Sequence, residues 1–312
     1  MKTISVISNK GGSGKSLTSF LIAGAIKKLN PDQRVLFVDL TQDQGSRSIS
    51  LAPEQERRGQ GMGRALTPLV MADGDEERMA EAGKEGAELL RKAIQPVCVV
   101  PGVGDQGVIG FAPAASSDLD KLAEGSWNKS PHPEMALVGL LSELDDDWDW
   151  VVFDTPGALN SPAVRAVMPI SDAVVIPCDC RVTETLAGLE KVFSQVKRIQ
   201  KAGLEVNLAG LIGNMIVPTA ASRETVQTLK EISTQRGIPV LAWIDHVTTA
   251  SNALRAYAIE VDGRPMRAGG LYYEALLSTN PNVKQKAENL AEQFEEIAGR
   301  LMKSAELVGQ AS

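Results

Sequence analysis

The chain has 312 residues, of which 43% are hydrophobic and 23% charged, and its formal net charge is −7. This composition is ordinary for a globular protein and is sufficient for one large α/β domain or two small ones. The acidic balance excludes a generally basic nucleic-acid coat but is compatible with one basic patch. The longest apolar runs, such as residues 173–177 and 208–212, are too short to cross a bilayer. Met1-Lys2 lead directly into an apolar segment, so we expect no removable signal peptide and a cytoplasmic location.

Cysteine and histidine are scarce. The three cysteines, Cys98, Cys178 and Cys180, are an odd number, and we expect reduced, partly buried thiols. The two histidines, His132 and His246, are too few for a His-rich metal site.

The first element is a strand over residues 4–7 that runs into the glycine-rich stretch 10–16 and then a helix over about 15–29. A strand, a glycine loop and a helix N-terminus together form a phosphate-binding unit, because backbone N–H groups and the helix dipole point at the anion. Lys15 would reach the β- and γ-phosphates of a nucleotide, and the Ser16 hydroxyl would ligate Mg²⁺. The usual first glycine of this loop is replaced by Asn9, and Lys10 places a second lysine inside it.

Two buried strands end in an acid. The first covers residues 34–39 and ends at Asp39, and the second covers residues 150–154 and ends at Asp154, followed by Thr155-Pro156-Gly157. At the carboxyl edge of a parallel sheet, Asp154 can hold a Mg²⁺-bound water beside the phosphates.

The remaining elements alternate between strands and helices. We predict an irregular surface excursion over about 50–75, a helix over 76–94, strands over 97–100 and 108–112, a loop over 116–132 and a helix over 133–144. Further on we predict a strand over 173–177, a helix over 183–202, a strand over 208–212 followed by Gly213-Asn214-Met215, a helix over 219–236, a strand over 239–243 and a helix over 250–260.

This alternation predicts a single α/β domain over residues 1–312: a doubly wound, mostly parallel sheet with helices on both faces, similar to P-loop NTPases. Such sheets bind ligands beyond the carboxyl ends of their strands. Lys15, Asp39, Asp154 and Asn214 all fall at such ends.

A final helix over about 282–307 carries an apolar stripe of Leu290, Phe294, Ile297 and Leu301. Its polar face has five acids against four bases, whereas a helix on anionic lipid needs a cationic excess. We therefore expect this helix to pack against the domain and not to bind a membrane.

The loop over residues 10–16, with the pattern Lys-Gly-Gly-x-Gly-Lys-Ser, the strand ending at Asp39 and the stretch 151–156 resemble the ParA/MinD family of deviant Walker A ATPases, and within it the ParA-type partition branch. The acidic final helix separates the chain from the MinD branch. The resemblance implies ATP and Mg²⁺ as cofactors and an ATP-sandwich homodimer in which Lys10 reaches the partner's phosphates. It implies metal binding by Ser16, Asp39 and Asp154 and catalysis involving Lys10, Lys15 and Asp39.

The resemblance also implies roles for the rest of the loop and for a base-reading residue. Nucleotide binding would involve Lys10, Gly11, Gly12, Ser13, Gly14, Lys15, Ser16 and Leu17, and Asn214 would read the adenine. An ordinary turn residue is the alternative for Asn214.

One departure from the family concerns hydrolysis. Where ParA-like proteins usually carry Asp-x-Asp, this chain has Asp39-Leu40-Thr41. A threonine hydroxyl is a far weaker base than a carboxylate, and Asp43 could take its place if the loop is shaped differently. We therefore expect slow ATP hydrolysis that a partner stimulates, with Thr41 and Asp43 as the candidate water-positioning residues.

Members of this family bind DNA without sequence preference and partition a plasmid, a chromosome or another cargo with a ParB-like or other adaptor. By this resemblance the ATP-bound protein would associate with the nucleoid. Arg223, Arg255, Arg264 and Arg267 are candidate DNA contacts, and scattered solvated charges are an equal alternative.

Two other functions stay open. A slowly or non-hydrolysing ATP-dependent binding module, such as a regulator or DNA-transfer accessory, would look similar, and Thr41 favours it. An electron-transfer ATPase like the nitrogenase iron protein would need a cluster-ligating cysteine seven residues after Asp154, where this chain has Ser161.

Overall fold

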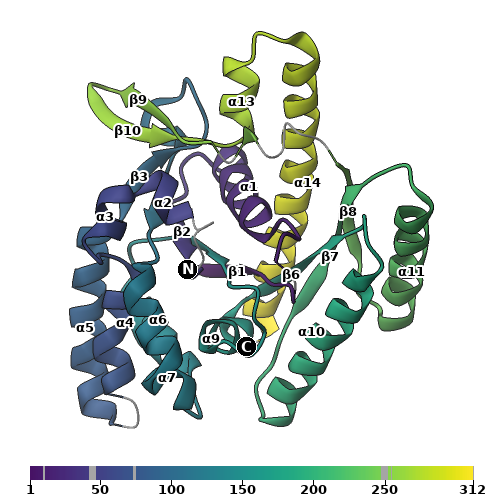
Figure 1. Ribbon diagram of the computed structural model, residues 1–312. Helices are drawn as coiled ribbons and strands as arrows, with labels where there is room; N and C mark the ends of the chain where they lie inside the picture. Colours follow the sequence, from purple (N-terminus) through teal and green to yellow (C-terminus); the bar gives the residue numbers. More distant parts are fainter. Residues whose placement is uncertain (10, 42–46, 73–74, 247–251, 254, 312) are drawn as a thin grey trace.

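The computed structural model describes residues 1–9, 11–41, 47–72, 75–246, 252–253 and 255–311 (Figure 1). At its centre is a ten-stranded sheet with the strand order β8-β7-β6-β1-β5-β2-β4-β3-β10-β9. The strands are β1 Lys2–Val6, β2 Val35–Asp39, β3 Gln95–Cys98, β4 Val108–Ala112, β5 Trp150–Asp154, β6 Ala173–Asp179, β7 Leu208–Ile216, β8 Val240–Asp245, β9 Tyr257–Val261 and β10 Arg264–Ala268.

Helices connect most of these strands. They are α1 Lys15–Leu29, α2 Arg47–Leu51, α3 Pro53–Arg57, α4 Met62–Met71, α5 Glu76–Ala93, α6 Ser116–Glu124, α7 Ser126–Lys129, α8 Glu134–Ser142, α9 Pro162–Ile170, α10 Glu184–Lys201, α11 Ala220–Arg236, α13 Leu271–Leu277 and α14 Pro281–Ala311, with one 3₁₀ turn at Gly104–Gly107. Within the described ranges, no helix combines the length and apolar content that crossing a membrane requires.

The sheet is parallel from β8 through β4. Every residue of β2, β5 and β6 is buried, as expected for strands covered on both faces. At the far end, β3 runs antiparallel to β4, and β9 runs antiparallel to β10. The prediction of a doubly wound, mostly parallel sheet is confirmed.

Helices cover both faces of this sheet (Figure 1). On one face, α1 packs along α14, and Phe20, Phe294 and Ile297 belong to one buried apolar cluster with the central strands. The other face carries α4, α5, α8 and α9 over β2, β4 and β5, with α10 and α11 over β6 and β7.

The final helix begins at Pro281, one residue before the predicted start, and ends at Ala311. Leu290, Phe294, Ile297 and Leu301 are all buried. Because its apolar stripe faces α1 and the sheet, the expected packing of this helix against the domain is confirmed.

Two segments are more regular than we predicted. The excursion over 50–75 contains α3, α4 and part of α2, and the loop expected over 116–132 contains α6 and α7. In α4 the buried residues recur at helical spacing, namely Met62, Ala65, Leu66, Leu69 and Val70. The sequence of this segment has the periodicity of an amphipathic helix, but the surrounding glycines and charged residues favoured an irregular reading.

The prediction of a helix over 250–260 is also wrong for the described part of that range. Residues 257–268 form a β-hairpin whose turn residues Asp262 and Gly263 have φ values of 50° and 76°. An Asp-Gly pair between alternating apolar residues is a strong hairpin signal, because both turn positions need positive φ. β7 likewise extends beyond 212 to Ile216, so Asn214 lies inside the strand and not after it.

Candidate functional site

The glycine-rich loop leaves the sheet at the end of β1. The Ile7 N–H donates to the Val175 carbonyl at 3.0 Å, and the hydroxyls of Ser8 and Ser13 are 2.6 Å apart across the loop. Helix α1 then begins at Lys15, a residue that is 8% exposed. The loop, with Gly11 and Gly12 exposed, therefore lies at the carboxyl edge of the sheet as predicted, whereas Lys10 lies outside the described residues.

Gly14 and Asn214 interlock at the start of α1. Gly14 has φ +86°, and a Cβ added there would lie 2.5 Å from the Asn214 Nδ2 atom. The Asn214 amide donates to the Ser13 carbonyl at 3.2 Å and accepts from the Met215 N–H at 2.9 Å. β7 therefore holds the loop through Asn214, a contact between residues that are 201 positions apart in the chain.

The carboxylate of Asp39 accepts four hydrogen bonds. Oδ1 accepts from the Thr41 N–H at 2.9 Å and from the Thr41 hydroxyl at 2.5 Å. Oδ2 accepts from the Ser48 N–H at 3.0 Å and from the Ser48 hydroxyl at 2.8 Å. The Ser48 oxygen also accepts from the Ala114 N–H at 2.7 Å, so Asp39 fixes the chain after β2 to the chain after β4.

Thr41 is consequently a donor to Asp39. Its hydroxyl proton points at a carboxylate, and 5% of the residue is exposed. Such a hydroxyl retains lone pairs that can accept a hydrogen bond from water, but it does not act as a base. Asp43, the other candidate for positioning water, lies outside the described residues.

Asp154 differs from its neighbour in making no hydrogen bond of normal geometry to a described residue, although the Ser16 and Ser19 hydroxyls lie close enough to lower its pKa. It is the register partner of Asp39 on adjacent parallel strands and is fully buried, and neither carboxylate oxygen has a partner among the described residues. Burial is the main reason that the pKa of Asp154 rises to about 7, and the nearby Asp39 adds to the rise. The Ser16 hydroxyl and the Lys15 ammonium act in the opposite direction on this pKa.

An orphaned, fully buried carboxylate next to a lysine and a serine at a helix N-terminus fits a divalent cation. Of the three predicted metal residues, Asp154 and Ser16 have this character. Asp39 does not, because two protein donors occupy each of its oxygens. A metal bound directly to Asp39 would share these oxygens with their protein donors, and the role of Asp39 as a metal ligand stays a prediction. Leu17 packs its side chain on the core, and its part in nucleotide binding stays a prediction.

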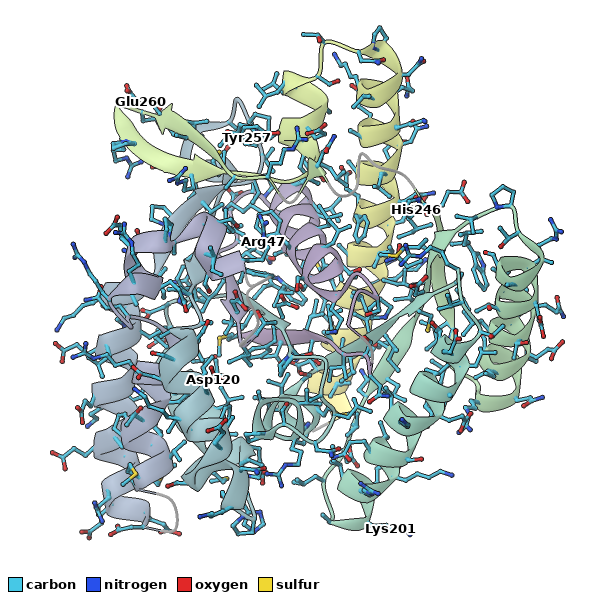
Figure 2. All side chains as sticks on the ribbon, viewed as in Figure 1. Arg47, Asp120, Lys201, His246, Tyr257 and Glu260 are labelled. Atoms are coloured by element: carbon cyan, nitrogen blue, oxygen red, sulfur yellow. The ribbon has the colours of Figure 1, made fainter. Side chains whose placement is uncertain are left out.

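Arg47 is a residue that sequence reasoning missed. It begins α2 with 4% of its surface exposed, and its guanidinium lies 4.7 Å from the centroid of the Phe20 ring (Figure 2). Burial lowers the pKa of Arg47 to about 10, and the charges of Asp39 and Asp154 partly oppose that change. A buried cation thus faces the acid pair, and no local sequence pattern indicates it.

The three cysteines carry no site. All are buried free thiols, and burial raises the pKa of Cys180 to about 12. Ser161, at the position where an iron protein would need a thiolate, caps α9 by accepting the Val164 N–H at 3.2 Å. Over the described residues, no group of three or more His, Cys, Asp or Glu side chains is arranged to hold a metal.

The four candidate DNA-binding arginines do not form one patch. Arg255, Arg264 and Arg267 lie on or next to the hairpin of β9 and β10, and Arg264 is paired with Asp105. Arg223 lies on α11, which packs on β7 near the opposite end of the sheet (Figure 1). Within one chain Arg223 therefore lies apart from the other three arginines, and all four stay candidate DNA contacts.

Comparisons with known proteins agree with this site. Residues 109–209 match the family described as an AAA domain. A putative septum site-determining protein MinD from Emiliania huxleyi is 24% identical over 254 residues, which is 80% of this chain and 78% of that protein. A ParA family protein from Mycoplasma pneumoniae is 25% identical over 229 residues, which is 70% of this chain and 77% of that protein.

Solved structures share the fold. Apo McdA from Cyanothece superposes with a TM-score of 0.63 at 18% identity, covering 94% of this chain and 99% of McdA. Cobyrinic acid a,c-diamide synthase from Mycobacterium smegmatis, with a bound ATP analogue and magnesium, superposes with a TM-score of 0.55 at 22% identity over 74% of this chain and 80% of that enzyme.

The segment that matches the family model includes β5 and Asp154 but not the glycine loop. In sequence the chain is similar to a putative MinD protein and to a ParA family protein, and it shares the fold of McdA and of an ATP-binding synthase.

Proposed function

We propose that this protein is a ParA-like ATPase that closes into an ATP-sandwich homodimer, binds DNA non-specifically and positions a cargo with the help of an adaptor protein. The observation that carries the proposal is the pairing of the glycine loop with Asp154. The loop supplies an anion site, and Asp154 supplies a buried carboxylate without a hydrogen bond beside it. A nucleotide with its magnesium ion satisfies both at once.

Asp154 and Ser16 would hold the magnesium ion, which when bound neutralises phosphate charge and orients the γ-phosphate for attack by water. Lys15, at the start of α1, is placed to contact the same phosphates. Asp39 would act indirectly, by holding Thr41 and Ser48 in place around the site.

Adenine recognition by Asn214 is compatible with its contacts. An amide has two N–H donors and an oxygen with two lone pairs, and the loop contacts use one of each. One donor and one lone pair therefore remain for the edge of a base. On this proposal Asn214 both supports the loop and reads the nucleotide.

The test of the dimer uses the two lysines of the loop. Lys10→Ala should keep nucleotide affinity within a few-fold and lose ATP-dependent dimers in sedimentation velocity, because its amine acts on the partner's phosphates. Lys15→Ala is the matched control and should weaken nucleotide binding itself. Dimers of Lys10→Ala that form with ATP as readily as those of the unmodified protein would refute the sandwich mechanism.

Binding to DNA would depend on the hairpin arginines Arg255 and Arg267 and would weaken steeply with salt, because it depends on phosphate contacts. The ATP-bound protein should be retained on DNA at low salt, and Arg255→Gln with Arg267→Gln should reduce that retention. On this proposal the DNA-bound form associates with the nucleoid, and a ParB-like or other adaptor stimulates hydrolysis and release. No retention at low salt would remove the transport mechanism.

One observation favours a second candidate, an ATP-dependent binding module with negligible turnover. The Thr41 hydroxyl donates to Asp39, so the position at which ParA-like proteins carry a second aspartate supplies no base here. Steady-state ATPase rates with and without DNA and a candidate adaptor separate the two functions. A rate that stays at background under every condition favours the binding module.

A further inference from the structure

An open surface cavity of about 400 Å³, lined by both polar and apolar side chains, lies away from the nucleotide site, between the α7–α8 connection, α9 and the last turns of α10. Lys201, the last residue of α10, marks this end of the molecule in Figure 2. The lining residues are Asn128, Pro131, Pro133, Glu134, Asn160, Arg165, Gln195, Arg198, Ile199, Ala202 and Leu204. Cavities of this size commonly hold small molecules.

Two arginines from different helices face this cavity. Arg165 lies on α9 and Arg198 on α10, and neither has a carboxylate within 4.0 Å among the described residues. Arg165 donates from Nη2 to the Asn128 carbonyl at 2.9 Å, which fixes the orientation of its planar group. Its Nε atom is buried and has no hydrogen-bond partner in the described part of the chain. Arg165 is half-buried and Arg198 is exposed, and Glu134 is an acid in the same lining that forms no ion pair with either arginine.

A buried amide adds a second, independent observation. Gln195 is 8% exposed and lines the cavity, and its side chain makes no hydrogen bond to any described residue. This amide can donate to and accept from a ligand in the cavity. Glu134 is also buried, and its Oε1 lies 3.2 Å from Nδ1 of the exposed His132. Ile199 and Leu204 supply apolar surface.

We propose that this cavity binds a small organic oxyanion that also carries a hydroxyl or amine group. Guanidinium groups stay protonated and bind carboxylate or phosphate through paired N–H groups. Arg165 and Arg198 hold the oxyanion between α9 and α10, and Gln195 donates a further hydrogen bond to it. Glu134 accepts from the hydroxyl or amine, which selects against a simple inorganic anion.

The site is distinct from the nucleotide loop but connected to it along the chain. Asn160 belongs to the segment between Asp154 and α9, so a bound ligand contacts the stretch that follows the metal-binding acid. This proposal concerns binding alone and does not depend on ATP hydrolysis, dimerisation or DNA.

The test is isothermal titration calorimetry at constant ionic strength with two probes, sn-glycerol 3-phosphate and L-malate. One probe represents phosphate esters and the other hydroxycarboxylates, and saturable binding of either supports the site and identifies the oxyanion. Arg198→Gln should weaken binding about tenfold or more, because a hydrogen-bonded charge contributes roughly 1.5–3 kcal/mol. Arg223→Gln, which removes an exposed arginine on α11, is the matched control and should leave the affinity unchanged.

A second variant guards against misfolding. Arg165→Gln also removes the contact to Asn128, so its circular dichroism must match that of the parent before its affinity is compared. Gln195→Leu removes no hydrogen bond between described residues and should weaken binding. Failure of both probes to bind would overturn the proposal. So would binding that Arg198→Gln leaves unchanged, which would place the probe elsewhere, for instance on the phosphate loop.

Discussion

Asp39 and Asp154 are direct register partners at the carboxyl ends of the neighbouring strands β2 and β5, but their surroundings are opposite. Asp39 accepts hydrogen bonds from the backbone and hydroxyl groups of Thr41 and Ser48, whereas Asp154 is buried with both oxygens unpartnered among the described residues. Two acids that look equivalent in the sequence therefore have different roles: Asp39 supports the loop, and Asp154 is available to a cation.

The first prediction compares the asparagine variants of these two acids. Asp39→Asn loses charge-assisted hydrogen bonds, so its free energy of unfolding should fall by about 3 kcal/mol or more. Asp154→Asn removes an unpaired buried charge, so it should be at least as stable as the parent while losing magnesium-dependent nucleotide binding. Urea denaturation and Mg²⁺ titrations of nucleotide binding measure both effects. Equal losses of stability in the two variants would contradict this division.

The second prediction concerns pH. The pKa of Asp154 in the folded chain is raised from 3.8 to about 7, so the folded state holds this proton more tightly than the unfolded state does. The contribution of this group to stability is therefore complete below 3.8 and is lost as pH rises to about 7. The stability advantage of Asp154→Asn over the parent should grow by a few kcal/mol across that window and level off above it. Urea denaturation of the nucleotide-free protein at several pH values tests this, and an advantage independent of pH would disprove it.

The third prediction concerns Gly14. It distinguishes the cost of a left-handed backbone from the cost of a collision with Asn214. Gly14 and Gly203 have φ values of +86° and +84°, but a Cβ would collide with Asn214 at Gly14 and would meet open space at Gly203. Gly203→Ala should cost about 1–2 kcal/mol, the price of a left-handed alanine. Gly14→Ala should cost more and should also weaken nucleotide binding, because it displaces the amide that holds the loop. Thermal unfolding and nucleotide titration of both variants provide the comparison, and equal behaviour would mean that the Asn214 contact is dispensable.

The fourth prediction tests Thr41 as a structural residue. Thr41→Val keeps the shape of the side chain and removes the O–H donor to Asp39, so stability should fall by roughly 1.5–3 kcal/mol. Single-turnover ATP hydrolysis should change only a few-fold, because the hydroxyl is not a base. Thr41→Ser, which keeps the donor, is the control for stability. A hundredfold loss of hydrolysis in the valine variant would instead make Thr41 part of the catalytic machinery.

The sequence predicted the parts of the site that are encoded by short patterns. The strand predicted over 4–7, the glycine loop and α1 follow one another in the chain, and a loop of this kind has few ways to fold once glycine permits positive φ at Gly12 and Gly14. The buried apolar strands that end at Asp39 and Asp154 were likewise found from their composition. The hairpin over 257–268 and the helix α4 were missed although Asp262-Gly263 and the apolar period of α4 carry local signals.

Only the tertiary structure decided what the two acids and Asn214 contact. The Ser48 hydroxyl donates to Asp39, nine positions earlier in the chain, and accepts from the N–H of Ala114, which follows β4. The Asn214 amide donates to the loop residue Ser13 across 201 positions. These contacts depend on how neighbouring strands align, which no local propensity encodes. The burial of Arg47 against Phe20 has the same origin, because a charged side chain is placed inside only when the surrounding elements provide acids and an aromatic face. The sequence by itself determined that a nucleotide loop and acids share one edge of the sheet, and the packing of distant segments determined which acid remains open to a metal ion.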